Sequence, residues 1–259
     1  MRVFAGTILL ACFVNLTEGT GCGTDTARAA VAAAPALPAV DYEATLQAIE
    51  ASRLRLAGRY TQADTEALRA AIRAEARAVF KAAIIEQLFP AWLGMAWGLG
   101  PNSTANRAHA PGMTVACGYF VSAVLENAGL RVKTRFSYAQ APALHVQRTL
   151  APGQGEVHRF FSVPGETLAA GIAGLGEGLY IIGLSNHIGF VVVDAAGVRL
   201  VHASYTGDQV VTSEPLATAE AIANSRSKGY FVSPVMHDDR LADLWLRGAA
   251  VPLVKPVEG

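Results

Sequence analysis

The chain has 259 residues, of which 52% are hydrophobic and 16% are charged, so it can bury one substantial core and does not have the composition of a disordered protein. Lys and Arg together number 21, and Asp and Glu also number 21, so no net charge favours nucleic acid or an anionic membrane surface as a partner. No zinc, P-loop or dinucleotide motif is present, and we therefore expect neither a metal, a cofactor nor bound nucleic acid.

Residues 1–22 are typical of an export signal. A mostly apolar run ends at Leu16, which is the length of a secretory signal and too short to cross a bilayer comfortably. Cys12 has the residues of a lipoprotein cleavage site before it but follows a very short apolar run, whereas Cys22 is better placed but lacks the apolar residue three positions earlier. We expect export to the periplasm or cell envelope, with a lipid on Cys22, a lipid on Cys12 or an ordinary cleaved signal as the alternatives.

Residues 23–40 are rich in Ala, Pro and Thr and predict a linker that need not fold. Residues 41–90 predict a helical preface. Apolar residues recur at helical spacing over 42–56, and a cap at 61–64 precedes a second helix that we expect to continue to residue 89 and to end at Pro90. Its apolar residues fall on one broad face, which predicts packing on the domain that follows.

Residues 91–259 predict one α+β domain. Residues 92–112 have the Gly and Pro content of a loop, and residues 118–130 predict a buried helix with Cys117 in its first turn. Between 131 and 178 we expect one strand and a short helix near 166–172. Strands are predicted at 179–184, 187–193, 198–204, 209–212 and 229–232, with a closing helix at 238–246. Helices first and antiparallel strands afterwards predict one sheet covered by helices.

Cys117 is the only cysteine outside the first 22 residues. A thiolate at a helix start is stabilised by the helix dipole and by a neighbouring imidazolium, and the backbone N–H of Cys117 is placed to hold an oxyanion. A cysteine in an apolar helix is more often a small core residue, so the prediction needs partners elsewhere in the chain.

Those partners come from a predicted hairpin. If Asp194 and Gly197 close a two-residue turn, facing residues have numbers that add up to 391, so Gly189 lies opposite His202. His187 and His202 then share one face, whereas Ile188, Phe190 and Val192 take the core face. Gly189 leaves room beside His187 for a substrate or an indole. The order Cys117, His187, His202 predicts a thiol hydrolase in which His187 is the base and His202 orients it.

Three sequence blocks resemble the NlpC-type cell-wall peptidases, a papain-like superfamily of bacterial cysteine hydrolases. They are Gly-Met-Ala-Trp-Gly-Leu-Gly at 94–100, Cys-Gly-Tyr-Phe-Val at 117–121 with Asn-Ala-Gly-Leu at 127–130, and His-Ile-Gly-Phe at 187–190 followed by His-Ala at 202–203. The resemblance covers roughly residues 90–205. It implies a papain-like core with the nucleophile helix packed on an antiparallel sheet, and a Cys117, His187 and His202 triad that cleaves an amide bond, usually in peptidoglycan stem peptides.

The chain departs from this family at positions that bind substrate. Ala116 and Gly118 stand where members commonly have an acidic residue and a serine, Trp97 replaces a tyrosine, and the stretch between the cysteine and the first histidine is longer. The residues expected to contact the substrate are Trp97, Gly118, Tyr119, Asn186, Ser204 and Tyr205. Two other functions on this fold are an inactive wall-binding or scaffold lipoprotein, and a thiol acyltransferase with an apolar tunnel beside Cys117.

Overall fold

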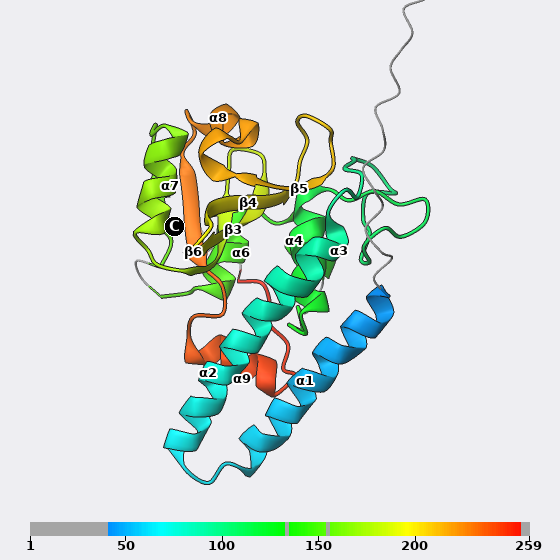
Figure 1. Cartoon of the computed structure of the whole chain (residues 1–259), viewed down its shortest axis with the longest axis vertical. Helices are drawn as coiled ribbons and strands as arrows, with labels where there is room; N and C mark the ends of the chain where they lie inside the picture. Colours follow the sequence, from blue (N-terminus) through cyan, green and yellow to red (C-terminus); the bar gives the residue numbers. More distant parts are fainter. Residues whose placement is uncertain (1–40, 133–134, 154–155, 255–259) are drawn as a thin grey trace, which may run out of the picture. The chain divides into compact units, whose positions relative to one another are not determined.

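The computed structural model describes residues 41–132, 135–153 and 156–254 (Figure 1). The predicted signal, lipid attachment site and linker lie outside these residues. Within them, no helix is long and apolar enough to cross a membrane.

The predicted preface is helical, with two corrections to its boundaries. It consists of α1 (Tyr42–Gln62), α2 (Glu66–Ala82), the π-helix η1 (Ala83–Leu88) and the short α3 (Phe89–Trp92). The cap predicted at 61–64 is wrong, because the Thr61 hydroxyl donates back to Ala57 O within α1 and Thr65 caps α2 by accepting from the Leu68 N–H.

Pro90 does not end the second helix as predicted. A proline in a regular α-helix clashes with the carbonyl four residues earlier and leaves it without a donor. Here the chain widens into the π-turns of η1, in which the Phe89 N–H bonds to Ile84 O, and Pro90 falls in the first turn of α3. The helical path therefore continues to Trp92 and packs this ring edge-to-face on Phe120.

Residues 93–116 form the predicted loop, and α4 (Cys117–Asn127) begins at the predicted cysteine. Gly129, at a φ of 88°, lies just beyond the end of α4, where only glycine adopts this conformation readily. In the next segment the predicted strand and short helix are present as β1 (His158–Phe160) and α7 (Gly165–Ala173). Two helices that were not predicted, α5 (Arg135–Gln140) and α6 (Ala143–Leu150), precede them.

The strands form one antiparallel six-stranded sheet in the order β1-β6-β2-β3-β4-β5. Its remaining strands are β2 (Gly178–Gly183), β3 (Ile188–Asp194), β4 (Gly197–Ala203), β5 (Val211–Pro215) and β6 (Tyr230–Pro234). The hairpin register is confirmed, because Asp194 pairs with Gly197 and Phe190 pairs with Val201. The α+β prediction with an antiparallel sheet is confirmed at this level.

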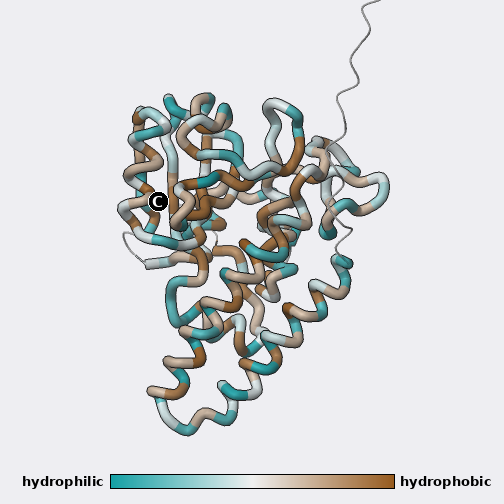
Figure 2. The backbone as a smooth tube through the Cα atoms, viewed as in Figure 1, coloured by the Kyte–Doolittle hydropathy of each residue, from teal (hydrophilic) through white to brown (hydrophobic). Residues whose placement is uncertain are grey.

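Helices cover both faces of the sheet. On one face Ile188, Phe190 and Val192 belong to a core shared with α1, α2, α4 and α9 (Asp239–Leu246), as predicted for these three residues. On the other face Val191, Val193 and Leu200 pack with α7, η2 (Leu216–Thr218) and α8 (Glu220–Ser225). Figure 2 shows the strands as largely hydrophobic, whereas α1 and α2 alternate between hydrophilic and hydrophobic residues. The start of β3 and the end of β4 are thus held in place by two cores.

Candidate active site

Cys117 lies in the first turn of α4, where backbone donors are free. The N-cap residue Ala116 offers no side-chain acceptor, and the first intrahelical bond runs from the Phe120 N–H to Ala116 O at 2.9 Å. The N–H groups of Cys117 and Gly118 precede that bond and therefore have no partner within the helix. Against the effect of burial, these two N–H groups and the N–H of Ile188 act to lower the pKa of the Cys117 thiol. This is an arrangement that stabilises negative charge on sulfur or on an attached oxyanion.

Two histidines and one glutamate form a chain of hydrogen bonds that leads to this position. His187 Nε2 lies 2.7 Å from His202 Nδ1, and His202 Nε2 lies 2.8 Å from Glu214 Oε1. Both imidazoles are buried, with His202 completely enclosed. The His187 ring also packs edge-to-face against Tyr205, with 5.2 Å between ring centroids. The predicted meeting of His187 and His202 on one face is confirmed.

The carboxylate fixes the tautomer of each ring. A carboxylate only accepts hydrogen bonds, so His202 donates to Glu214 from Nε2, and a neutral His202 then has its lone pair on Nδ1. That lone pair accepts the Nε2–H of His187. The remaining nitrogen of His187, Nδ1, is left with a lone pair, which is the form required of a general base.

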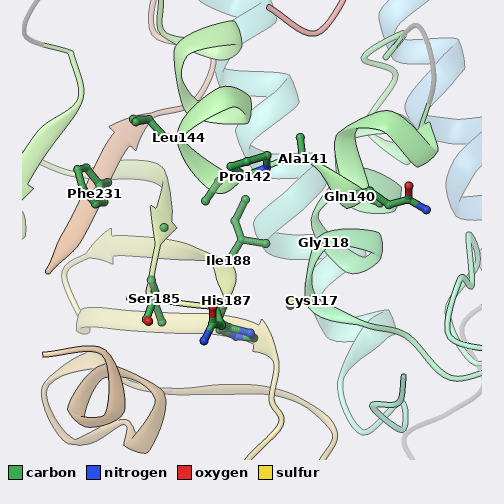
Figure 3. A pocket seen from close by; sticks show the side chains of 15 residues that line it. Cys117, Gly118, Gln140, Ala141, Pro142, Leu144, Ser185, His187, Ile188 and Phe231 are labelled. Atoms are coloured by element: carbon green, nitrogen blue, oxygen red, sulfur yellow. The ribbon is translucent and has the colours of Figure 1, made fainter. Parts of the chain in front are cut away.

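A cavity of about 460 Å³ lies next to both the thiol and the base. Both Cys117 and His187 line it, and Figure 3 shows the His187 side chain extending toward the start of α4, where Cys117 lies. The other walls are the α5–α6 segment, the end of β2 and Phe231 on β6. Its volume is within the range of small-molecule sites in enzymes.

Burial sets the protonation of the resting pair. Burial raises the pKa of the Cys117 thiol above its ordinary value, although the backbone N–H groups of Ile188, Gly118 and Cys117 oppose this. Burial and the neighbouring His202 lower the pKa of His187. Both shifts work against the expected thiolate beside an imidazolium and favour a thiol beside a neutral imidazole. Proton transfer then accompanies attack on the substrate.

Two glycines at the site are required by close packing. A Cβ on Gly118 would lie 2.0 Å from Ala139 O, so α5 occupies the place that a side chain at this position would need. A Cβ on Gly189 would lie 2.9 Å from His202 Cβ. The expectation that Gly189 leaves room for a substrate or an indole is wrong, because the His202 side chain takes that space.

The predicted substrate contacts divide into two groups. Gly118 and Asn186 line the cavity, whereas Trp97, Tyr119, Ser204 and Tyr205 are not among its lining residues. Tyr119 touches the site indirectly, since its hydroxyl accepts from Gln140 Nε2 at 2.9 Å. The Ser204 hydroxyl bonds to Thr206 and is buried, so it is a turn residue here. Trp97 packs against the core.

Glu214 is the member of the site that sequence reasoning missed. Leu200 pairs with Glu214 across β4 and β5, so Glu214 shares a face with His202 as a diagonal neighbour. The predicted strand 209–212 ended before this residue, and β5 runs from 211 to 215. Had the predicted strand been extended by two residues, from 212 to 214, the side-chain alternation would have placed the Glu214 carboxylate beside His202.

No group of three or more His, Cys, Asp or Glu side chains suited to a metal ion occurs in the part of the chain that the structure describes. Comparisons of the chain with protein-family models, with curated proteins and with solved structures returned no match. The resemblance to NlpC-type peptidases therefore rests on the three sequence blocks given above. The structure adds to it the arrangement of Cys117, His187, His202 and Glu214.

Proposed function

We propose that the chain is a cysteine hydrolase with a papain-like core that cleaves an amide bond, and that peptidoglycan stem peptides at the cell envelope provide this bond. The observation that supports it best is the unbroken chain from Glu214 through His202 to His187, which ends in the cavity that contains Cys117. Buried histidines in series need such partners, because an unpaired buried ring nitrogen destabilises the fold.

The reaction follows from the tautomers. His187 Nδ1 takes the thiol proton as the Cys117 sulfur bonds to the carbonyl carbon, and the N–H groups at the start of α4 hold the oxyanion. The C–N bond then breaks while His187 returns the proton to the leaving nitrogen. Water attacks the thioester, His187 takes a water proton, and the C–S bond breaks to release the acid and restore the thiol. His202 and Glu214 stabilise the imidazolium that forms twice in this cycle.

Peptidoglycan as substrate is supported by the three sequence blocks and by the export signal that the sequence predicts in residues 1–22. A lipid on Cys22 or Cys12 would hold the enzyme at a membrane of the envelope, and the described core then acts on the cell wall nearby. Ala116 and Gly118 replace residues that bind the stem peptide in the family, so we propose a bond other than the usual one.

Digestion of purified sacculi tests the proposal. We expect the native protein to release peptide fragments that are detected by mass spectrometry, and Cys117→Ala and His187→Ala to release none. His237→Ala is the matched control, because His237 also pairs with a glutamate, Glu156, but lies outside the cavity. Equal release by the native protein and Cys117→Ala would refute hydrolysis of this substrate by the thiol.

A thiol acyltransferase is the second candidate, and the mostly apolar lining of the cavity favours it. Both reactions form the same acyl-Cys117 intermediate. They differ only in the nucleophile that accepts the acyl group from Cys117, which is water in a hydrolase and another acceptor in a transferase. Addition of a primary amine during turnover separates them: a hydrolase gives mainly free acid, and a transferase gives mainly the acylated amine.

A further inference from the structure

None of the side chains that line the cavity beside Cys117 carries a fixed charge. Among its lining residues there is no Asp, Glu, Lys or Arg, and the ionisable groups are Cys117 and His187. The other lining residues are Gly118, Ala139, Gln140, Ala141, Pro142, Ala143, Leu144, Gly183, Leu184, Ser185, Asn186, Ile188 and Phe231. The site therefore presents no side chain of fixed charge to a ligand.

Apart from His187 the polar lining side chains are exposed, whereas the larger apolar ones apart from Pro142 are buried or half-buried. Gln140, Ser185 and Asn186 are exposed, and the last two form the turn between β2 and β3. Ile188 and Leu184 are buried, and Leu144 and Phe231 are half-buried. Figure 3 shows Leu144 and Phe231 on the far side of the cavity from Cys117. The arrangement is a polar rim around an apolar interior, which is typical of sites that bind an apolar group.

The apolar wall is held rigidly. Phe231 pairs with Gly183 across β6 and β2, and its carbonyl accepts a hydrogen bond from the buried Gln147 Nε2 at 2.7 Å. A Cβ on Gly183 would lie 2.8 Å from Ala143 Cβ, so α6 packs directly on the strand. Backbone pairing and helix packing thus fix the position of this wall.

A charged substrate group in this interior would lose its hydration without gaining an opposite charge. That loss costs several kcal/mol for a carboxylate or an ammonium, whereas each buried methylene gains about 0.8 kcal/mol. We propose that the cavity selects an uncharged, apolar acyl group as the part of the substrate that becomes attached to Cys117. The inference rests on the proposed function and names its substrate class. Within a stem peptide it favours bonds whose acyl residue has a small apolar side chain and no free carboxylate or ammonium.

A series of p-nitrophenyl esters tests the selection, because the leaving group stays constant while the acyl group changes. We expect kcat/KM, corrected for spontaneous hydrolysis, to rise about tenfold from acetate to butyrate and again to hexanoate, since each step adds two methylenes. The adipate monoester has the chain length of hexanoate and ends in a carboxylate. We expect it to react at least about 100-fold more slowly than hexanoate.

Two variants test whether the cavity is the cause of the preference for an uncharged acyl group. Leu144→Arg places a cation at the half-buried wall, and we expect it to raise the adipate-to-hexanoate ratio at least about tenfold. Leu54→Arg adds the same charge on α1, where Leu54 is exposed and lies outside the cavity, and the ratio should stay unchanged. Cys117-dependent turnover that is equal for all four esters in the native protein would overturn the inference and leave the proposed function intact. Turnover that Cys117→Ala retains in full would overturn the proposed function itself.

Discussion

Removal of the Glu214 carboxylate should slow the reaction without unfolding the protein. Glu214 Oε1 accepts a 2.8 Å bond from His202, whose side chain is completely buried, while the glutamate side chain is 31% exposed. A hydrogen bond to a charged group contributes about 1.5–3 kcal/mol. Loss of about 2 kcal/mol of transition-state stabilisation in Glu214→Ala corresponds to about a 30-fold lower kcat/KM. Glu214→Gln retains an acceptor oxygen and should lose about threefold to tenfold.

The assay is kcat/KM for p-nitrophenyl hexanoate between about pH 2 and 9, because burial lowers the pKa of His187 to about 3. Burial lowers the pKa of His202, and the hydrogen bond and charge of Glu214 partly offset this. Without the carboxylate the imidazole pair is a weaker base, so the acidic limb of the profile should move to lower pH as the plateau falls. A residue with only a structural role would lower the plateau and leave the limb in place.

Glu156→Gln is the matched control for this experiment. Glu156 bonds to His237 Nε2 at 3.0 Å and has a side chain that is 27% exposed, but this pair is not part of the cavity. We expect its profile to match that of the native protein. A Glu214→Ala protein with kcat/KM within twofold of native would refute the role given to the carboxylate.

Three further predictions concern stability and processing. Burial holds the pKa of His187 below its ordinary value. As the pH falls below about 6.5, this histidine is therefore protonated in the unfolded chain but not in the folded protein. The free energy of unfolding then decreases by up to about 1.4 kcal/mol per pH unit. In urea unfolding, the free energy of unfolding of the native protein should decrease from pH 7 to pH 5.5 by about 1 kcal/mol more than that of His187→Gln. An equal decrease in both proteins would contradict a buried, neutral His187 ring. Gly118→Ala should lower the free energy of unfolding by about 3 kcal/mol because its Cβ meets Ala139 O, whereas Gly58→Ala, with nothing within 4 Å in α1, should raise it by up to about 1 kcal/mol. Equal effects of the two substitutions would contradict the packing at α4. Cells grown with labelled palmitate should label the protein if it carries a lipid. The substitution that abolishes the label, Cys22→Ala or Cys12→Ala, then identifies the attachment site. An unlabelled native protein would indicate an ordinary cleaved signal.

The sequence predicted the hairpin well because its register depends on local chemistry. Asp194 and Gly197 enclose two small residues, Gly197 adopts a φ of 117°, and the Ala196 N–H bonds to the Asp194 side chain. Such a turn fixes every pair along β3 and β4. The meeting of His187 and His202, separated by 15 positions in the chain, followed from that turn alone.

The sequence predicted less where long-range packing decides the structure. The first helix was expected to end near residue 56, but α1 extends to Gln62 because Tyr60 is buried and donates to Asp243, 183 residues away. The segment that contains α5 and α6 gave a weak pattern, yet it forms one wall of the cavity. Its position depends on the contact of Ala139 O with Gly118, which neither segment reveals by itself.

Alkylation of Cys117 by iodoacetamide as a function of pH tests most directly the claim that thiol and imidazole act as one unit. The modified peptide is quantified by mass spectrometry in the full chain, in His187→Ala and in the control His237→Ala. Since a neutral His187 accepts the thiol proton, we predict that native protein and His237→Ala react at least about tenfold faster than His187→Ala between pH 6 and 8. A Cys117 that reacts at the same rate with and without His187, or that does not react in the folded protein, would contradict the account.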